Sequence, residues 1–131
     1  MKAAKFVHIG NARPGLYGKV ISEIARKGVC PFCPAQLTNF HKNPFRKKKF
    51  WIVTDNMYPY KPVKRHLLLI HRKHIEHLSE ITKGAWQELH AVIAEECRHE
   101  KITGGTLLLR FGDTKYIGSS VTHLHAHLVQ S

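Results

Sequence analysis

The stretch that decides the fold runs from 121 to 129 and reads VTHLHAHLV. Within it, His123, His125 and His127 alternate with apolar residues. Side chains of a β-strand point to opposite faces with a period of two, so the run predicts a strand with three imidazoles on one face and apolar side chains in the core. Imidazoles placed this way could attack phosphorus or bind a metal ion. A polar, solvent-facing strand edge is the alternative without chemistry.

The rest of the chain offers helical and extended segments of ordinary length. Apolar residues spaced by three or four predict helices over 16–27 and 79–99, and short apolar runs predict strands over 50–54, 66–70, 106–110 and 121–129. A doubly wound parallel sheet is excluded, because it needs a helix after each strand and only one long helix is available. We therefore expect an α+β fold with an antiparallel sheet of about five strands, one long helix and one or two short helices.

Size and charge narrow the class of partner. The chain has 131 residues, which suits a single domain. Its 21 Lys and Arg residues outnumber its 9 Asp and Glu residues, which gives a net charge of +12. This charge favours polyanions, namely nucleotides, nucleic acid or acidic membrane surfaces, and does not choose among them. The basic run 46–49 is interpreted as a solvated surface.

The cysteines and the apolar segments indicate the compartment. An odd number of cysteines, three, gives no disulfide framework. No segment has the apolar length of a signal peptide or a membrane span. We expect a cytoplasmic protein with reduced cysteines and no membrane partner.

Cys30 and Cys33 form a C-x-x-C pair. Pro31 and Pro34 interleave with the cysteines, so the segment is expected to form a tight knuckle rather than a regular helix. Two cysteines supply half of a tetrahedral zinc site. The alternatives are a reduced surface pair or a redox pair, but the redox pair would need a thioredoxin-like βαβ setting, which this sequence lacks.

Two blocks of sequence carry a family resemblance. The run GSSVTHLHAHLV at 118–129 resembles the H-φ-H-φ-H-φ-φ signature of the histidine triad (HIT) family, where φ is apolar. The run HLLLIHRKHI at 66–75 resembles the family's H-φ-φ-φ-φ-P-x-x-H-φ block, with His71 in place of the proline. The runs NMYPY at 56–60 and RFGD at 110–113 are similar to bacterial diadenosine polyphosphate hydrolases and phosphorylases. The resemblance spans about residues 30–129.

This resemblance implies one HIT-like domain over 1–131, with an N-terminal helix and C-x-x-C knuckle over 1–40 and a HIT core over 50–129. It also implies catalytic roles. His125 matches the nucleophile that attacks the α-phosphorus and forms a nucleotidyl-histidine. His127 matches the histidine that contacts the phosphate, His66 an upstream histidine that supports the nucleophile, and Ser120 a serine near the leaving group.

The resemblance further implies a zinc site and a nucleoside site. Zinc-bearing members would use His74 and His123 with the two cysteines, so the implied structural zinc has the ligands Cys30, Cys33, His74 and His123. Candidates for the nucleoside site are Phe32, Trp51, Val53, Asp55 and Asn56. The first three are equally compatible with an ordinary core, and the ribose contact is ambiguous between Asp55 and Asn56. Arg110 could bind a phosphate through its guanidinium, and the alternative is a surface salt bridge.

The leading hypothesis is an enzyme. It would be a nucleotidyl hydrolase or transferase that cleaves a dinucleoside polyphosphate or a nucleoside phosphoramidate at the α-phosphate, without an organic cofactor. One alternative is a nucleotide-binding or nucleic-acid-binding module without turnover. Another is a metalloenzyme with catalytic zinc on the three triad histidines. A homodimer is expected from the family alone, and nucleic acid is a possible but not favoured partner.

Overall fold

The computed structural model describes residues 6–7, 16–117 and 120–131. Its centre is a five-stranded antiparallel sheet with the order β1-β2-β3-β5-β4. The strands are β1 (Phe45–Lys47), β2 (Trp51–Asp55), β3 (Arg65–His71), β4 (Thr106–Arg110) and β5 (His125–Gln130). The expected α+β class and the expected strand number are confirmed.

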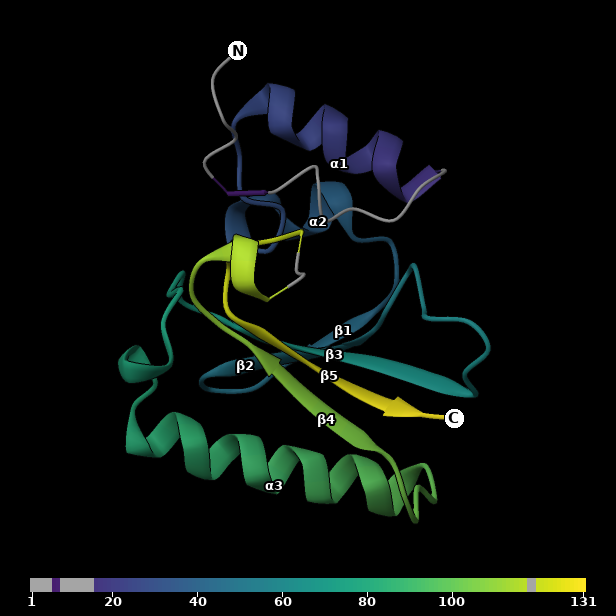
Figure 1. The fold of residues 1–131 in the computed structure, drawn as a ribbon. Helices are drawn as coiled ribbons and strands as arrows, with labels where there is room; N and C mark the ends of the chain where they lie inside the picture. The colour runs from purple at the N-terminus through teal and green to yellow at the C-terminus, as the bar shows by residue number, and fades with distance from the viewer. Residues whose placement is uncertain (1–5, 8–15, 118–119) are drawn as a thin grey trace.

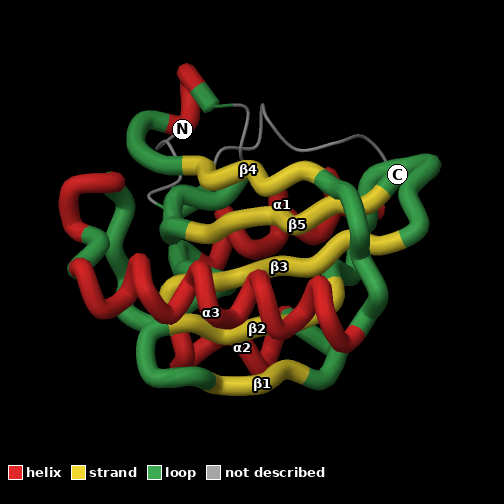
Figure 2. Tube along the Cα trace, turned by 90° about the horizontal axis from the view of Figure 1, so that it is seen from below, coloured by secondary structure: helices red, strands yellow, loops and turns green. Residues whose placement is uncertain are grey.

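Helices cover both faces of the sheet. The long helix α3 (Lys83–His99) lies against one face, and the shorter helices α1 (Leu16–Lys27) and α2 (Pro34–Phe40) lie on the other (Figures 1 and 2). Single 3-10 turns occur at Leu78–Glu80 and Thr114–Tyr116. Among the described residues, every helix is too short or too polar to cross a bilayer. The sheet is thus the middle of three layers.

Several element boundaries differ from the sequence prediction. The helix over 16–27 and the strand over 106–110 are confirmed. The long helix begins at Lys83 rather than at 79, because the Thr82 side chain accepts the Ala85 N–H and caps it. The knuckle prediction is wrong from Pro34 onward: this proline opens α2, at a position where a missing N–H is tolerated. The short edge strand β1, which overlaps the basic run 46–49, was not predicted.

The predicted strand 121–129 is wrong for its first four residues. β5 begins at His125, and the preceding backbone bonds to other parts of the chain. The Thr122 N–H donates to the Phe6 carbonyl at 2.9 Å, and the Leu124 N–H donates to the Ile75 carbonyl at 2.8 Å. His123 therefore lies outside the strand that carries the other two triad histidines.

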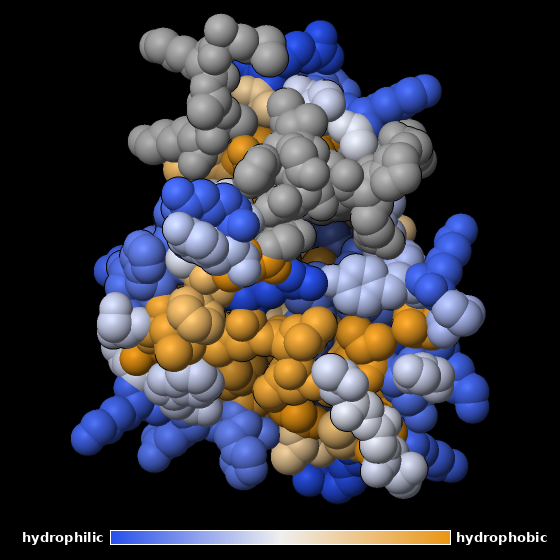
Figure 3. All heavy atoms as spheres, in the orientation of Figure 1, coloured by the Kyte–Doolittle hydropathy of each residue, from blue (hydrophilic) through white to orange (hydrophobic). Residues whose placement is uncertain are grey.

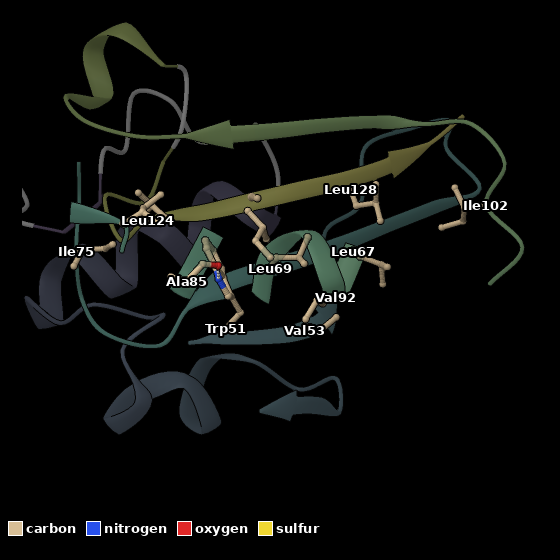
Figure 4. Close-up of a cluster of buried hydrophobic side chains, with 13 residues drawn as sticks. Trp51, Val53, Leu67, Leu69, Ile75, Ala85, Val92, Ile102, Leu124 and Leu128 are labelled. Carbon is tan, nitrogen blue, oxygen red and sulfur yellow. Dashed lines mark hydrogen bonds between the residues drawn. The ribbon is translucent and has the colours of Figure 1, made fainter. Parts of the chain in front are cut away.

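The main hydrophobic core lies between the sheet and α3. Its members come from β2, β3, α3 and β5 and from the loops next to them (Figure 4). Trp51 is fully buried there, and its indole N–H donates to the Ala85 carbonyl at 2.8 Å. Two smaller apolar clusters lie on the opposite face, beneath α1 and α2. Stability is thus concentrated on the α3 face, and the other face has room for polar groups.

One carboxylate ties α3 to the turn between β1 and β2. Glu88 accepts backbone N–H groups from Lys49, Phe50 and Trp51 at 3.0, 2.7 and 3.0 Å. We expect Glu88→Ala to lower the free energy of unfolding by about 2–3 kcal/mol, because three backbone donors lose a charged acceptor. Urea denaturation measures this change. The exposed neighbour Gln87 provides the control Gln87→Ala, and equal unfolding midpoints for the two variants would contradict the role of Glu88.

Candidate functional site

The register of the sheet places three polar side chains, those of Arg110, His125 and His127, on the face below α1 and α2. His125 lies between Ile70 on β3 and Arg110 on β4, and His127 pairs with Leu68 on β3. Paired residues of an antiparallel sheet project to the same face. Both histidines, Arg110 and the buried Ser120 line one cavity of about 240 Å³. The structure therefore brings together three of the four predicted catalytic residues with the predicted phosphate ligand.

His125 is held in one tautomer. Its Nδ1 lies 2.7 Å from the His123 carbonyl, which can only accept, so Nδ1 carries the proton and Nε2 carries the lone pair. Burial, together with the nearby positive charge of Arg110, lowers the pKa of His125 to about 4. The ring is therefore neutral near pH 7, the form in which an imidazole is a nucleophile.

A chain of hydrogen bonds fixes the proton of His127. The Tyr60 backbone N–H donates to His66 Nδ1 at 3.1 Å, so His66 must carry its proton on Nε2. That N–H lies 2.7 Å from His127 Nδ1 and donates to it. Because His127 Nδ1 accepts this hydrogen bond, the ring proton of neutral His127 is on Nε2, which is therefore a hydrogen-bond donor. The Tyr60 ring stacks on His127, with ring centroids 5.6 Å apart. His66 thus fixes the tautomer of His127 through this hydrogen bond.

Arg110 places a positive charge beside His125. Its guanidinium donates to the Ile117 carbonyl and, at 3.3 Å, to the Tyr60 hydroxyl. Both acceptors are uncharged, which argues against the alternative of a surface salt bridge. The charge remains available to an anion in the cavity. Of the signature run, Gly118 and Ser119 lie outside the described residues.

The nucleoside candidates separate into two groups. Asn56 and Phe32 line the cavity, and the Phe32 ring lies 5.1 Å from the His125 ring. The Asn56 side-chain oxygen accepts the Tyr58 N–H at 2.8 Å, which orients its amide. Asp55 is exposed and lies outside the cavity lining. Trp51 and Val53 belong to the core on the opposite face, which agrees with the core alternative for both residues.

Sequence reasoning missed three polar residues that line this cavity, Tyr58, Tyr60 and His41. Tyr60 lies within the NMYPY run, so the family resemblance could have indicated it. His41 follows α2 and has no motif around it. Residues of α1, including Ile21 and Ile24, also line the cavity, although they were considered only as a helix stripe.

A second cluster lies beside the cavity and fits a tetrahedral metal ion. One donor atom from each of Cys30, Cys33, His74 and His123 lies within 4.8 Å of the others. The measured separations include 3.2 Å from Cys33 Sγ to His74 Nδ1, 3.5 Å from Cys30 Sγ to His123 Nδ1 and 3.1 Å between the two Nδ1 atoms. Zinc bonds of ordinary length give a tetrahedron with edges of about 3.3–3.8 Å. The predicted ligand set is therefore assembled.

The hydrogen bonds that His74 and His123 make outside the cluster use Nε2, so that Nδ1 of each ring faces the other ligands. His123 Nε2 lies 2.5 Å from the His71 carbonyl, and His74 Nε2 lies 2.7 Å from a Glu76 carboxylate oxygen. Both contacts leave Nδ1 as the donor to a metal, as is usual for zinc-binding histidines. Burial raises the pKa of the Cys30 thiol to about 12, so its thiolate requires a cation nearby. The cluster uses His123 alone among the triad, which disfavours zinc on all three triad histidines.

Comparisons with known proteins agree with this fold. A sequence model described as the HIT domain matches residues 46–131. No curated protein matches the chain.

Many solved structures are similar to the chain. A histidine triad nucleotide-binding protein from Candida albicans has a TM-score of 0.65 and 18% identity, with 79% of this chain and 76% of that chain covered. A Zn-bound histidine triad family protein from Mycobacterium smegmatis has a TM-score of 0.58 and 21% identity, with 77% and 73% covered. A diadenosine triphosphate hydrolase from Plasmodium falciparum has a TM-score of 0.56 and 20% identity, with 66% and 59% covered. At these identities the likeness concerns the fold.

Proposed function

Because the chain belongs to the HIT domain family, we propose that it is a nucleotidyl hydrolase or transferase that cleaves nucleotides at the α-phosphate. The observation that carries this proposal is a pair of histidines that line one cavity, each with its ring proton fixed in position by a hydrogen bond. His125 Nε2 offers a lone pair, and His127 Nε2 offers a proton, on one side of one cavity. The substrate class is a dinucleoside polyphosphate or a nucleoside phosphoramidate, in keeping with the hydrolase among the structural neighbours.

The reaction proceeds through two displacements at phosphorus. His125 Nε2 attacks the α-phosphorus, a P–N bond to the ring forms, and the bond from phosphorus to the leaving group breaks. Water then attacks the same phosphorus and loses a proton, the P–N bond to His125 breaks, and a nucleoside monophosphate is released. If phosphate attacks instead, the same P–N bond breaks and a nucleoside diphosphate is released. The His127 N–H and the Arg110 guanidinium would stabilise the charge on the phosphoryl oxygens, and Ser120, which lines the same cavity, would contact the leaving group.

The same cavity would bind the nucleoside. Asn56, whose amide is oriented by the Tyr58 N–H, would bind the ribose. Phe32 and the apolar residues of α1 would form the walls around the base. Residues 1–40 precede the matched region, yet α1 and α2 line this cavity, so we propose that they complete one domain with the core.

A direct assay tests this function. The protein is incubated with diadenosine tetraphosphate and with adenosine phosphoramidate, with and without inorganic phosphate. We expect turnover of at least one substrate, with AMP as the product if water is the acceptor and ADP if phosphate is. Absence of turnover with both substrates would contradict the proposal.

A structural zinc is part of the proposal, since the four-residue cluster has the donor set and outer partners that zinc prefers. Bound there, the metal would tie the C-x-x-C segment to the chain just before β5. All three cysteines are free thiols, and we place the protein in the cytoplasm, where thiols stay reduced.

A second candidate function rests on the net charge of +12. The chain would then bind nucleic acid through its basic surface, without turnover. Affinity for a short RNA or DNA duplex would fall steeply with salt, because binding releases counterions. Such binding, together with inactivity toward both nucleotide substrates, would favour this candidate.

We also propose a homodimer formed through β4. This edge strand exposes Leu107 and Leu108, at 47% and 38%, and apolar side chains gather over β4 on the face in view in Figure 3. An apolar edge strand invites pairing with a second copy. We expect light scattering to give twice the mass of one chain for the wild type and a single-chain mass for Leu108→Lys. The control is Leu78→Lys, at 37% exposure, and equal behaviour of both variants would contradict this interface.

A further inference from the structure

One buried polar side chain of the cavity has no part in the phosphate chemistry. His41 follows α2, is 8% exposed, and lines the same cavity as His125 and His127. Its neighbours in the lining include the apolar side chains of Ile24 and Phe40. An imidazole buried among apolar groups needs hydrogen-bond partners, so its two ring nitrogens define what it can do there.

The hydrogen bonds around His41 fix its tautomer. The Thr54 hydroxyl donates its single proton to the Pro44 carbonyl at 2.8 Å. The same hydroxyl oxygen lies 2.6 Å from His41 Nε2, so the ring must donate there and Nε2 carries the proton. His41 Nδ1 therefore carries a lone pair. Burial lowers the pKa of His41, which keeps the ring neutral near pH 7.

His41 Nδ1 faces space that a ligand can reach. Among the described residues, no buried side-chain nitrogen or oxygen lacks a hydrogen-bond partner. The ring of His41 makes its one hydrogen bond through Nε2. Nδ1, for which the described residues provide no hydrogen bond, is therefore accessible, and the His41 residue lines the cavity.

The sheet sets the distance between His41 and His127. Thr54 pairs with Leu68, and Leu68 pairs with His127, so the three side chains form a row across β2, β3 and β5. Adjacent strands lie about 4.8 Å apart, which puts Thr54 about 10 Å from His127. His41 is bonded to Thr54 at one end of this row, and Leu68 lies between the two ends as part of the cavity lining.

That span is comparable to the distance from the α-phosphate of a nucleotide to the far edge of its base. A phosphate beside His127 would leave the ribose near Asn56 and the base over Leu68, with its outer edge at His41. A lone pair on Nδ1 accepts from an N–H group and repels a carbonyl oxygen. The row of side chains thus matches a base with an amino group on its outer edge.

We propose that His41 is a specificity-determining residue that accepts a hydrogen bond from the exocyclic amino group of the nucleobase, the 6-amino group in the case of adenine. This inference rests on the proposed nucleotide function. Thr54 is the positioning residue, because its hydroxyl holds the His41 ring in the accepting tautomer.

Calorimetric binding of three nucleoside monophosphates to the wild-type protein tests the proposal. AMP carries the amino group, purine riboside monophosphate has hydrogen in its place, and IMP has a carbonyl oxygen. We expect AMP to bind about tenfold more tightly than purine riboside monophosphate, the factor for one hydrogen bond in a buried site, and IMP to bind no better than the latter. Equal affinities for AMP and purine riboside monophosphate would overturn the role of His41 and leave the nucleotide function standing. Failure of all three to bind would instead contradict the nucleotide function.

Two variants separate recognition from folding. His41→Phe removes the hydrogen-bond acceptor. Thr54→Val keeps the His41 ring but removes the hydroxyl that holds its proton on Nε2. Both should reduce the preference for AMP over purine riboside monophosphate to about one, with the affinity for the latter retained. His41→Asn, which can donate to Thr54 and still accept, should restore part of the preference. If His41→Phe is folded by circular dichroism and keeps the tenfold preference, the inference is wrong.

Discussion

Replacing His125 by alanine is expected to abolish turnover of diadenosine tetraphosphate and adenosine phosphoramidate, with a fall in kcat of about 10⁴-fold or more. Removing the nucleophile of a covalent mechanism leaves only the stabilising groups around it. In the proposed mechanism these are His127 and Arg110, which would bind the phosphate but could not form the intermediate. Rapid-quench assays with radiolabelled substrate measure the rate, and acid-sensitive label on the protein reports the nucleotidyl-histidine in the wild type.

The matched control is His90→Ala, because His90 is an exposed histidine on α3, away from the cavity. That variant should keep wild-type kcat. His125→Ala should still bind AMP, since the groups assigned to the ribose and the phosphate are untouched. A His125→Ala protein that is folded, binds AMP and turns over substrate within tenfold of the wild type would show that another group attacks the phosphorus.

Replacing Cys33 by serine is expected to remove the bound metal and to lower the melting temperature by about 10 °C or more. Wild-type protein should contain about one zinc per chain, as a closed four-ligand site requires. Loss of one ligand leaves the C-x-x-C segment unattached to His74 and His123, and the buried Cys30 loses the cation that its thiolate needs. Elemental analysis measures the metal, and differential scanning calorimetry measures the melting temperature.

Cys97→Ser is the control for this second change, because Cys97 packs against the core on the other face of the sheet. It should keep its zinc. Should Cys33→Ser fail to fold, chelation of the wild-type protein gives the same information through the shift in melting temperature. Wild-type protein with well under one equivalent of zinc, and a melting temperature indifferent to chelation, would refute the structural metal.

The sequence predicted what depends on local periodicity or on a spaced motif. Alternation on 125–129 correctly placed His125 and His127 on one face, because a strand's period is fixed by backbone geometry. The four residues of the candidate metal cluster were indicated by the motifs that contain them. Alternation failed at His123, since Phe6 and Ile75 take the backbone hydrogen bonds that would have extended the strand. Both partners lie far away in the sequence, and no local pattern contains them.

The remaining differences arise from tertiary contacts. Trp51 could be a nucleoside ligand or a core residue on sequence alone, and the strand register decides, because it points the indole toward α3. Pro34 looked like a helix breaker, although at a first helical position it is compatible with a helix. His41 gains its place from Thr54, and Arg110 from its pairing with His125. Pairings between distant segments cannot be read from residue spacing.

One face of the sheet packs against α3 in the main core, and the other face lines the cavity. This separation affects which substitutions the fold can accept. Substitutions in α1 and α2 would reshape the walls of the cavity while the larger core under α3 stayed intact. A directed-evolution library confined to those two helices would therefore sample new substrate preferences from a population of variants that mostly still folds. The larger core and the cavity walls that such a library would vary thus lie on opposite faces of one sheet.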